Sequence, residues 1–585
     1  MDATEQSARS RRVEEAGADA DVAPRRDGRS DPRASIPAVF TWQHSRVGLT
    51  VAVLFFALSL LPSLLPRTPL LQGVVAGASA AIGYGVGTLF DWVWGYLSLP
   101  RPRPGSAAAH TVRGVVLVVL AVLAALTVWH QVGWQNDLRN LFGMDPVSPL
   151  GWGITALVAL VTAVVVVVLS RGVRRLFRLV AARLGRRLPE RLARVLGFVA
   201  VAALLVFLIN GVLVSLLFDA ANAAFSVRDN STDDGIVAPT AAERSGSPGS
   251  VVPWDTLGRQ GRNFVARGPT PEELEAFHDE PATTPIRVYV GLRSAETLQQ
   301  RADLVLEELL RTGAFEREVL VVATTTGTGF LEPNAMDSLE FLHNGDTAVA
   351  GVQYSFLPSW ISLLADQAIT RETSQVVFRT VHDHWRSLPE DERPALYLFG
   401  LSLGSFGVES ILSSIEVINA PVDGALLTGP PFVNELWRTI TENRDEGSPA
   451  WLPIYAEGRT VRFTGLENAL DEPTGEWGDT RIVYLQHNSD PVVFFSPRML
   501  FTRPEWLEEG QRGPDVSERM VFVPLVTAVQ TLIDLPGAGN VPEGFGHLYS
   551  IRENIDSWAA VTRPDGWTDA DADRLEQVML ERREE

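Results

Sequence analysis

Residues 395–410, ALYLFGLSLGSFGVES, decide the fold. They hold a serine, Ser402, between two glycines, directly after an apolar run and directly before a helix-like segment. Short continuous apolar runs are typical of strands that are buried on both faces. A strand that passes into a helix through Gly-x-Ser-x-Gly presents the serine on a sharp turn, where its hydroxyl can act as a nucleophile. The same pattern also arises by chance in long chains, so the flanking sequence must support it.

Further apolar runs alternate with helix-like segments on both sides of Ser402. The runs occupy residues 286–292, 318–324, 347–356, 395–400, 424–429 and 481–486. One helix is expected from an N-cap at Ser294 to a stop at Gly313, and another near 369–387. This alternation predicts a mostly parallel sheet with helices on both faces. The predicted fold is an α/β-hydrolase domain over residues 254–585, because Ser402 then lies on the nucleophile turn of that fold.

The partners expected for Ser402 come later in the chain. A serine hydroxyl is a weak nucleophile, so it needs a base, and the base needs an orienting acid. In this fold they follow in the order Ser, Asp or Glu, His. Asp490 follows the run 481–486, and His547 lies beyond it in a glycine-rich loop, whereas His487 precedes Asp490 and breaks the order. We therefore predict a triad of Ser402, Asp490 and His547.

Two backbone N–H groups are needed to stabilise the oxyanion that such a nucleophile would generate. One is expected from Leu403, directly after the serine. The other is expected from the loop TTTGTGFLEP, residues 324–333, where Thr326, Gly327 and Thr328 are the candidates. The alternative interpretation of this loop is a hydroxyl-rich turn.

Other candidate residues fit less well. Asp515 and Asp534 are rival acids, but neither follows a strand at the required place. His382 and His384 suggest a metal site, yet residues two apart on a helix do not face one another, so we expect surface positions for both. No other spacing indicates a metal or a nucleotide, and no cofactor is expected.

Five apolar runs precede the hydrolase segment, each close to the roughly 20 residues that cross a bilayer as a helix. They occupy residues 47–66, 70–99, 112–130, 150–170 and 195–218. The predicted organisation is a disordered tail over 1–40, a membrane domain with about five transmembrane helices over 41–218 and a linker over 219–253. The pairs Gly73/Gly77 and Gly83/Gly87 are expected to let these helices pack closely.

Arginine placement predicts the orientation in the membrane. The tail and the connections around 101–113 and 171–194 are rich in arginine, whereas the alternate connections hold only Arg67 and Arg139. The positive-inside rule then predicts a multi-pass plasma-membrane protein with a cytoplasmic N-terminus and an extracytoplasmic hydrolase domain. The cores of the runs lack charged residues, which argues against transport. A net charge of −20 argues against a nucleic-acid partner.

The whole arrangement resembles the actinobacterial membrane-anchored α/β-hydrolases, which join a multi-span N-terminal region to an exported catalytic region. The segments that carry the resemblance are WDTLGRQGRNFV (254–265), TTTGTGF (324–330), GLSLGS (400–405), SDPVVFF (489–495) and FGHLY (545–549). The resemblance implies a serine hydrolase fold but no particular substrate. The chain lacks the His-Gly-Gly loop of the wider superfamily, so its oxyanion donors are less well defined than its triad.

The leading functional hypothesis is a serine esterase or lipase that acts on acyl esters, with envelope lipids as substrates and membrane lipids as surroundings. An acyltransferase, which passes the same acyl group to a sugar, lipid or protein hydroxyl, is the alternative. A non-catalytic membrane scaffold is the third hypothesis. Because one helix would suffice as an anchor, the membrane region is expected to help present a lipid substrate. A fragment of residues 250–585 should therefore cleave short-chain esters nearly as well as the full chain, but long-chain envelope lipids in vesicles much more slowly.

Overall fold

The computed structural model describes residues 45–100, 106–147, 152–207, 214–365, 367–414, 416–417 and 420–584. The predicted tail over residues 1–40 lies outside these ranges. Residues His44–Glu585 form one compact unit.

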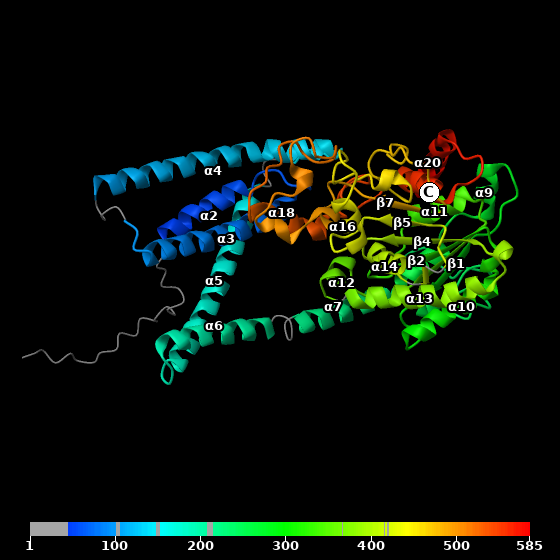
Figure 1. The fold of residues 1–585 in the computed structure, drawn as a ribbon, viewed down its shortest axis with the longest axis horizontal. Helices are drawn as coiled ribbons and strands as arrows, with labels where there is room; N and C mark the ends of the chain where they lie inside the picture. The colour runs from blue at the N-terminus through cyan, green and yellow to red at the C-terminus, as the bar shows by residue number, and fades with distance from the viewer. Residues whose placement is uncertain are drawn as a thin grey trace, which may run out of the picture. The chain divides into compact units, whose positions relative to one another are not determined.

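A seven-stranded parallel sheet forms the centre of the hydrolase region (Figure 1). Its strands are β1 (Ile286–Val290), β2 (Val319–Thr324), β3 (Thr347–Val352), β4 (Ala395–Leu401), β5 (Gly424–Thr428), β6 (Val461–Thr464) and β7 (Arg481–Leu485), in the spatial order β1-β3-β2-β4-β5-β7-β6. The predicted α/β-hydrolase fold is confirmed. The sequence predicts every strand except β6, an edge strand of four residues that is too short to carry a periodic signal.

Helices cover both faces of this sheet (Figure 1). One face carries α10 (Leu298–Thr312), α13 (Gln367–Ser387) and α14 (Leu403–Leu412), and the other carries α11 (Pro333–Leu342), α19 (Ile551–Thr562) and α20 (Asp569–Glu584). Other α-helices among the described residues of this region are α8 (Gly258–Ala266), α9 (Pro271–His278), α12 (Ser359–Ala365), α16 (Glu435–Glu442), α17 (Pro491–Phe494) and α18 (Val526–Asp534). The sheet is buried between the two layers, as the continuous apolar runs predict.

The ends of α10 test the capping prediction. Its stop at Gly313 is confirmed, because this residue adopts φ 72° in the left-handed region that favours glycine. Its start is wrong by three residues, since Thr297 is the N-cap and forms a capping box with Gln300. Ser294 instead accepts a hydrogen bond from the backbone N–H of Gly291 at 3.0 Å.

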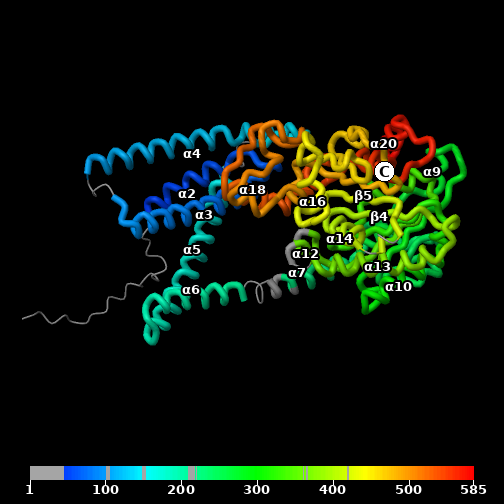
Figure 2. Tube along the Cα trace, in the orientation of Figure 1, coloured from blue at the N-terminus to red at the C-terminus, as the bar shows by residue number. Residues whose placement is uncertain are grey.

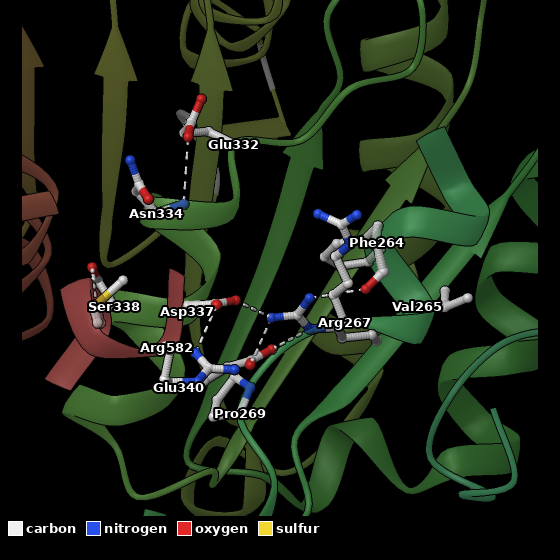
Figure 3. Close-up of polar contacts among 12 residues, drawn as sticks. Phe264, Val265, Arg267, Pro269, Glu332, Asn334, Asp337, Ser338, Glu340 and Arg582 are labelled. Carbon is white, nitrogen blue, oxygen red and sulfur yellow. Dashed lines mark hydrogen bonds and ion pairs between the residues drawn. The ribbon is translucent and has the colours of Figure 1, made fainter. Parts of the chain in front are cut away.

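A buried charge cluster ties the last helix to the sheet (Figure 3). Arg287 of β1 donates to Glu340 at 2.7 Å and to Asp337 at 2.6 Å, both on α11. Figure 3 shows Arg582 of α20 beside the same carboxylates, and it donates to Asp337 at 3.0 Å. Each buried charge therefore has a partner of opposite sign, which offsets much of the cost of removing it from water.

Three of the described helices are long and apolar enough to cross a membrane: α3 (Pro69–Tyr96), α4 (Ala107–Leu141) and α5 (Trp152–Leu184). The first and last predicted spans lie on the shorter helices α2 (Arg46–Leu58), α6 (Glu190–Val206) and α7 (Val214–Asp229). The count of five spans therefore stays a prediction.

The four predicted glycines of α3 do lie at close helix contacts. A Cβ added at Gly73 or Gly77 would collide with backbone carbonyl oxygens of α5. A Cβ at Gly83 or Gly87 would lie 2.7 Å from a carbonyl oxygen of α2. The prediction of close packing is confirmed, and α3 packs against both α2 and α5.

The segment assigned to a linker, residues 219–253, is not a free linker. Ser245 is fully buried in the hydrolase region. Its hydroxyl donates to Glu308 at 2.9 Å and accepts the backbone N–H of Tyr289 at 3.1 Å. The polar composition that suggests a linker reflects these buried hydrogen bonds, which the sequence does not reveal.

A buried ion pair joins the N-terminal helices to the hydrolase region. The guanidinium of Arg67 donates to both carboxylate oxygens of Asp534, at 2.7 and 2.8 Å, and neither side chain is exposed. Arg67 also donates to Gln72 of α3 at 3.2 Å and, through its backbone N–H, to Gln135 of α4 at 3.1 Å. Asp534 ends α18, which lies beside α3 in Figure 2. One arginine therefore binds two helices of the N-terminal region and one of the hydrolase region.

Apolar contacts extend the same junction. The hydrophobic core of the sheet continues into residues of the N-terminal region: Leu64, Leu65, Leu138 and Phe142. The Phe142 ring stacks on Phe545 with centroids 4.5 Å apart. A fragment of residues 250–585 would lose these contacts and leave Asp534 without its cation. We therefore expect this fragment to be less stable than the full chain.

Arg67→Ala should destabilise the full chain by about 3–5 kcal/mol, because it leaves the Asp534 carboxylate buried and unpaired. The matched control is Arg519→Ala, which removes an ion pair with Asp137 whose side chains are 63% and 51% exposed. This control should cost less than about 1 kcal/mol. Denaturant unfolding of both variants in detergent, followed by tryptophan fluorescence, measures the difference. Equal losses would show that the buried pair contributes no special stability.

Candidate active site

The carboxyl ends of the central strands are level at one edge of the sheet. Thr324 of β2 is in register with Gly400 of β4, and Thr428 of β5 is in register with both Leu401 and Leu485. The loops that leave these strands therefore begin side by side. This register brings the loops that carry Ser402 and Asp490 to the same edge of the sheet.

Ser402 occupies a single-residue turn between β4 and α14. Its φ of 54° and ψ of −124° are unfavourable for a residue with a side chain, and such strain costs on the order of 1–3 kcal/mol. The turn is held by a hydrogen bond of 2.8 Å from the Ser402 N–H to the carbonyl of Thr428. The Ser402 side chain has no capping hydrogen bond with α14.

The two glycines beside Ser402 allow this turn to pack. A Cβ at Gly400 would collide with the backbone of Gly404, and a Cβ at Gly404 would collide with the carbonyl oxygen of Thr324. The start of α14 therefore presses directly on β4 and β2. Any residue larger than glycine at either position would therefore disrupt this close packing.

His547 and Asp490 form a close pair at this edge. Nδ1 of His547 lies 2.5 Å from Oδ2 of Asp490. The same carboxylate oxygen accepts the Tyr549 hydroxyl at 3.0 Å, and Oδ1 accepts the Val492 N–H at 2.8 Å. Asp490 is fully buried, so three hydrogen bonds define its orientation. Among the described residues, none forms a hydrogen bond with Nε2 of His547.

Ser402 and His547 lie against consecutive residues at the end of β5. The backbone of Ser402 is bonded to Thr428, as described above. A Cβ at Gly429, the next residue, would lie 2.5 Å from Cε1 and 2.9 Å from Nδ1 of His547. Gly429 has φ 55°, so both its conformation and the space beside it exclude a side chain. The imidazole therefore packs on the backbone that holds the serine.

Two of the predicted oxyanion donors, both in the loop after β2, already donate hydrogen bonds to other acceptors. The Thr326 N–H donates to the carbonyl of Phe330 at 3.0 Å, and the Gly327 N–H donates to the Ser359 hydroxyl at 3.1 Å. These two donors would have to release their acceptors first, so the structure does not support them as donors for an oxyanion. Leu403 begins α14, where N–H groups have no acceptor within the helix, and it stays a candidate together with Thr328.

Sequence reasoning set His487 aside, yet it lies next to the site. Its Nε2 is 2.7 Å from Glu553 and its Nδ1 is 2.9 Å from the carbonyl of Gly546. Its ring stacks on that of Tyr549, with centroids 4.4 Å apart. Burial lowers the pKa of His487, but the charge of Glu553 and the hydrogen bond to it outweigh burial and raise the pKa to about 9. In the sequence, only the nearness of His487 to Asp490 could have suggested that His487 lies beside the site.

The rival acids have other partners. Asp534 pairs with Arg67, and Asp515 accepts the backbone N–H of Ser489 at 2.7 Å. The expectation of a surface position for His382 is wrong, because this residue is fully buried and its ring stacks on Phe378. No group of three or more potential metal ligands occurs in the part of the chain that the structure describes.

Comparison with known families agrees with the α/β-hydrolase fold. Residues 286–575 match a family described as "Alpha/beta-hydrolase family", and residues 60–269 match its "Alpha/beta-hydrolase family N-terminus". The chain belongs to this α/β-hydrolase family. No curated protein and no solved structure matches it. The N-terminal match of this α/β-hydrolase spans the apolar helices from α3 onward as well as residues 219–253, which the sequence alone assigns to a separate linker.

The pKa of His487 predicts a dependence of stability on pH. Because the folded-state pKa is raised from 6.5 to about 9, the stabilisation is complete below pH 6.5 and is lost as the pH rises through 9. It amounts to about 3 kcal/mol at 1.36 kcal/mol per pKa unit. Free energies of unfolding at pH 6 and pH 10 should therefore differ less in His487→Asn than in the unchanged chain. The same difference in both proteins would contradict the raised pKa.

Proposed function

We propose that this α/β-hydrolase is a membrane-anchored serine hydrolase that cleaves acyl esters through Ser402, His547 and Asp490. The observation that carries the proposal is the strained turn of Ser402 beside an imidazole that is bonded to a buried carboxylate. A residue whose backbone is held in an unfavourable conformation is typical of a functional site. The family match supports the hydrolase fold.

The proposed mechanism gives each residue one role. Ser402 attacks the acyl carbonyl while Nε2 of His547 takes its proton, and the acyl-enzyme forms as the alcohol leaves with a proton from His547. Asp490 holds Nδ1, so the lone pair of the neutral ring is on Nε2. The Leu403 N–H stabilises the oxyanion. Water then attacks the acyl-enzyme while Nε2 of His547 takes its proton. His547 returns this proton to the Ser402 oxygen as the acid is released.

The apolar residues around the serine support an acyl substrate. Leu403 and Phe406 of α14 form a buried apolar cluster with Tyr354 and Leu363. Leu403 directly follows Ser402, so this cluster begins beside the nucleophile. Apolar side chains next to a reactive group favour a substrate with hydrocarbon near the bond that breaks. We include envelope lipids in the proposal on this ground and because of the adjoining apolar helices.

Contacts between the regions support the proposed orientation in the membrane. The connection between α2 and α3 holds Arg67, and the end of α4 holds Phe142, and both contact the hydrolase region. The arginine distribution predicts the extracytoplasmic side for these same two connections. Arg67 is moreover paired in a buried site, so its charge does not oppose that topology. We propose a cytoplasmic N-terminus and an extracytoplasmic hydrolase domain in the plasma membrane.

Ser402→Ala should abolish labelling by a fluorophosphonate probe and hydrolysis of p-nitrophenyl butyrate, because no nucleophile remains. The variant should keep the melting temperature of the unchanged chain within a few degrees, since Ala retains the Cβ and the backbone of the turn and removes no capping hydrogen bond. Gel fluorescence and absorbance measure the two activities. Labelling that persists in the variant, or an unchanged chain that is never labelled, would sink the proposal.

Gly429→Ala should lower kcat by about 100-fold, because the added methyl group displaces the His547 ring by roughly 1 Å. Gly510→Ala is the matched control, since Gly510 also has a positive φ, 78°, but nothing within 4 Å of an added Cβ. Both variants bear similar backbone strain, and only the first touches the imidazole. Steady-state kinetics and melting temperatures should therefore separate them. A comparable kcat in the two variants would show that the ring position is unimportant.

A further inference from the structure

The loop that carries His547 is held at the residue before it. The Gly546 N–H donates to the Ser489 hydroxyl at 3.0 Å, and the Gly546 carbonyl accepts from Nδ1 of His487 at 2.9 Å. Both donor and acceptor groups of this residue are thus bound by the segment that also ends in Asp490. The position of the imidazole relative to its acid therefore depends on two contacts outside the triad.

His487 can make its two hydrogen bonds only when both ring nitrogens carry hydrogen. The Gly546 carbonyl is an acceptor, and the ionised Glu553 carboxylate is an acceptor as well. A neutral imidazole would direct a lone pair at one of the two. The geometry, at 2.9 and 2.7 Å, therefore requires an imidazolium.

The groups that face His487 favour that charge. Glu553 lies on α19 and also accepts the Ser550 N–H at its second oxygen, so its orientation is defined. Asp515 contributes a second negative charge, and the Tyr549 ring covers one face. Asp490 lies three residues further along the chain, and its oxygens are bonded to His547, Tyr549 and Val492. The resulting pKa of about 9 keeps His487 charged at neutral pH.

We propose that His487 is a positioning residue, an imidazolium at neutral pH that holds the Gly546 carbonyl and so places His547 against Asp490 and Ser402. The inference rests on the proposed function. His487 does not contact the serine or the substrate in this scheme. The ion pair with Glu553 holds the His487 ring in place, and the ring in turn holds the loop that carries His547.

Two neutral variants separate positioning from packing. Asn has an amide nitrogen near the place of Nδ1, so His487→Asn can still donate to Gly546, whereas the longer His487→Gln can donate only near Glu553. We expect kcat for p-nitrophenyl butyrate to fall about 10–100-fold in His487→Gln, with KM unchanged, and clearly less in His487→Asn. The rate of fluorophosphonate labelling should fall in the same order. Equal kcat values in the two variants would overturn the proposal.

Glu553→Gln provides a second measurement if the first variants fail to fold. Loss of the carboxylate lowers the pKa of His487 while the side-chain amide can still cap α19. In the unchanged chain, kcat/KM should decline above about pH 9, and in Glu553→Gln this decline should begin at least one pH unit lower. Coinciding pH profiles would contradict the role of the charge. If the unchanged chain is labelled but the variants behave alike, only this inference fails, whereas an unlabelled chain rejects the proposed function itself.

Discussion

The close approach of α14 to β4 and β2 is the constraint on which the candidate site depends. The helix begins one residue after the strand ends, so its first turn presses on the backbone of Gly400 and Thr324. No side chain fits at Gly400 or Gly404, and Ser402 has to adopt a positive φ. The level carboxyl ends of β5 and β7 then place the next loops beside it. Strand register and one tight turn therefore define the position of the serine before any other side chain is considered.

The apolar helices are part of the hydrolase fold and more than an attached anchor. Arg67 is removed from water together with Asp534, and it also donates to Gln72 and, through its backbone N–H, to Gln135. Phe142 stacks on Phe545, two residues before His547. The same loop is thus packed against the N-terminal helices on one side and bonded to His487 on the other. A change in the packing of the N-terminal helices would therefore shift Phe545 and, two residues later in the same loop, the His547 imidazole.

Much of the fold and part of the site follow from local sequence. The six predicted strands are continuous apolar runs, and a strand buried on both faces needs such a run wherever it lies. Gly400, Gly404 and Gly313 follow from backbone geometry within a few residues of each position. The chain order of Ser402, Asp490 and His547 follows from the fold, and the contact between Asp490 and His547 agrees with it. By contrast, the edge strand β6 and the N-cap Thr297 depend on neighbours that short patterns do not reveal.

The sequence by itself determined the positions of six strands along the chain, the serine turn and the close packing of α3, because each depends on residues a few positions apart. Only the tertiary structure decided which charges are buried together. Arg67 and Asp534 are separated by 467 positions, and His487 and Glu553 by 66. In the sequence these residues resemble ordinary loop charges, and the low dielectric of the interior makes their pairing important. The tertiary structure also decided the hydrogen bonds of the loop after β2. The N–H groups of Thr326 and Gly327 donate to Phe330 and Ser359, and these contacts depend on how the loop folds.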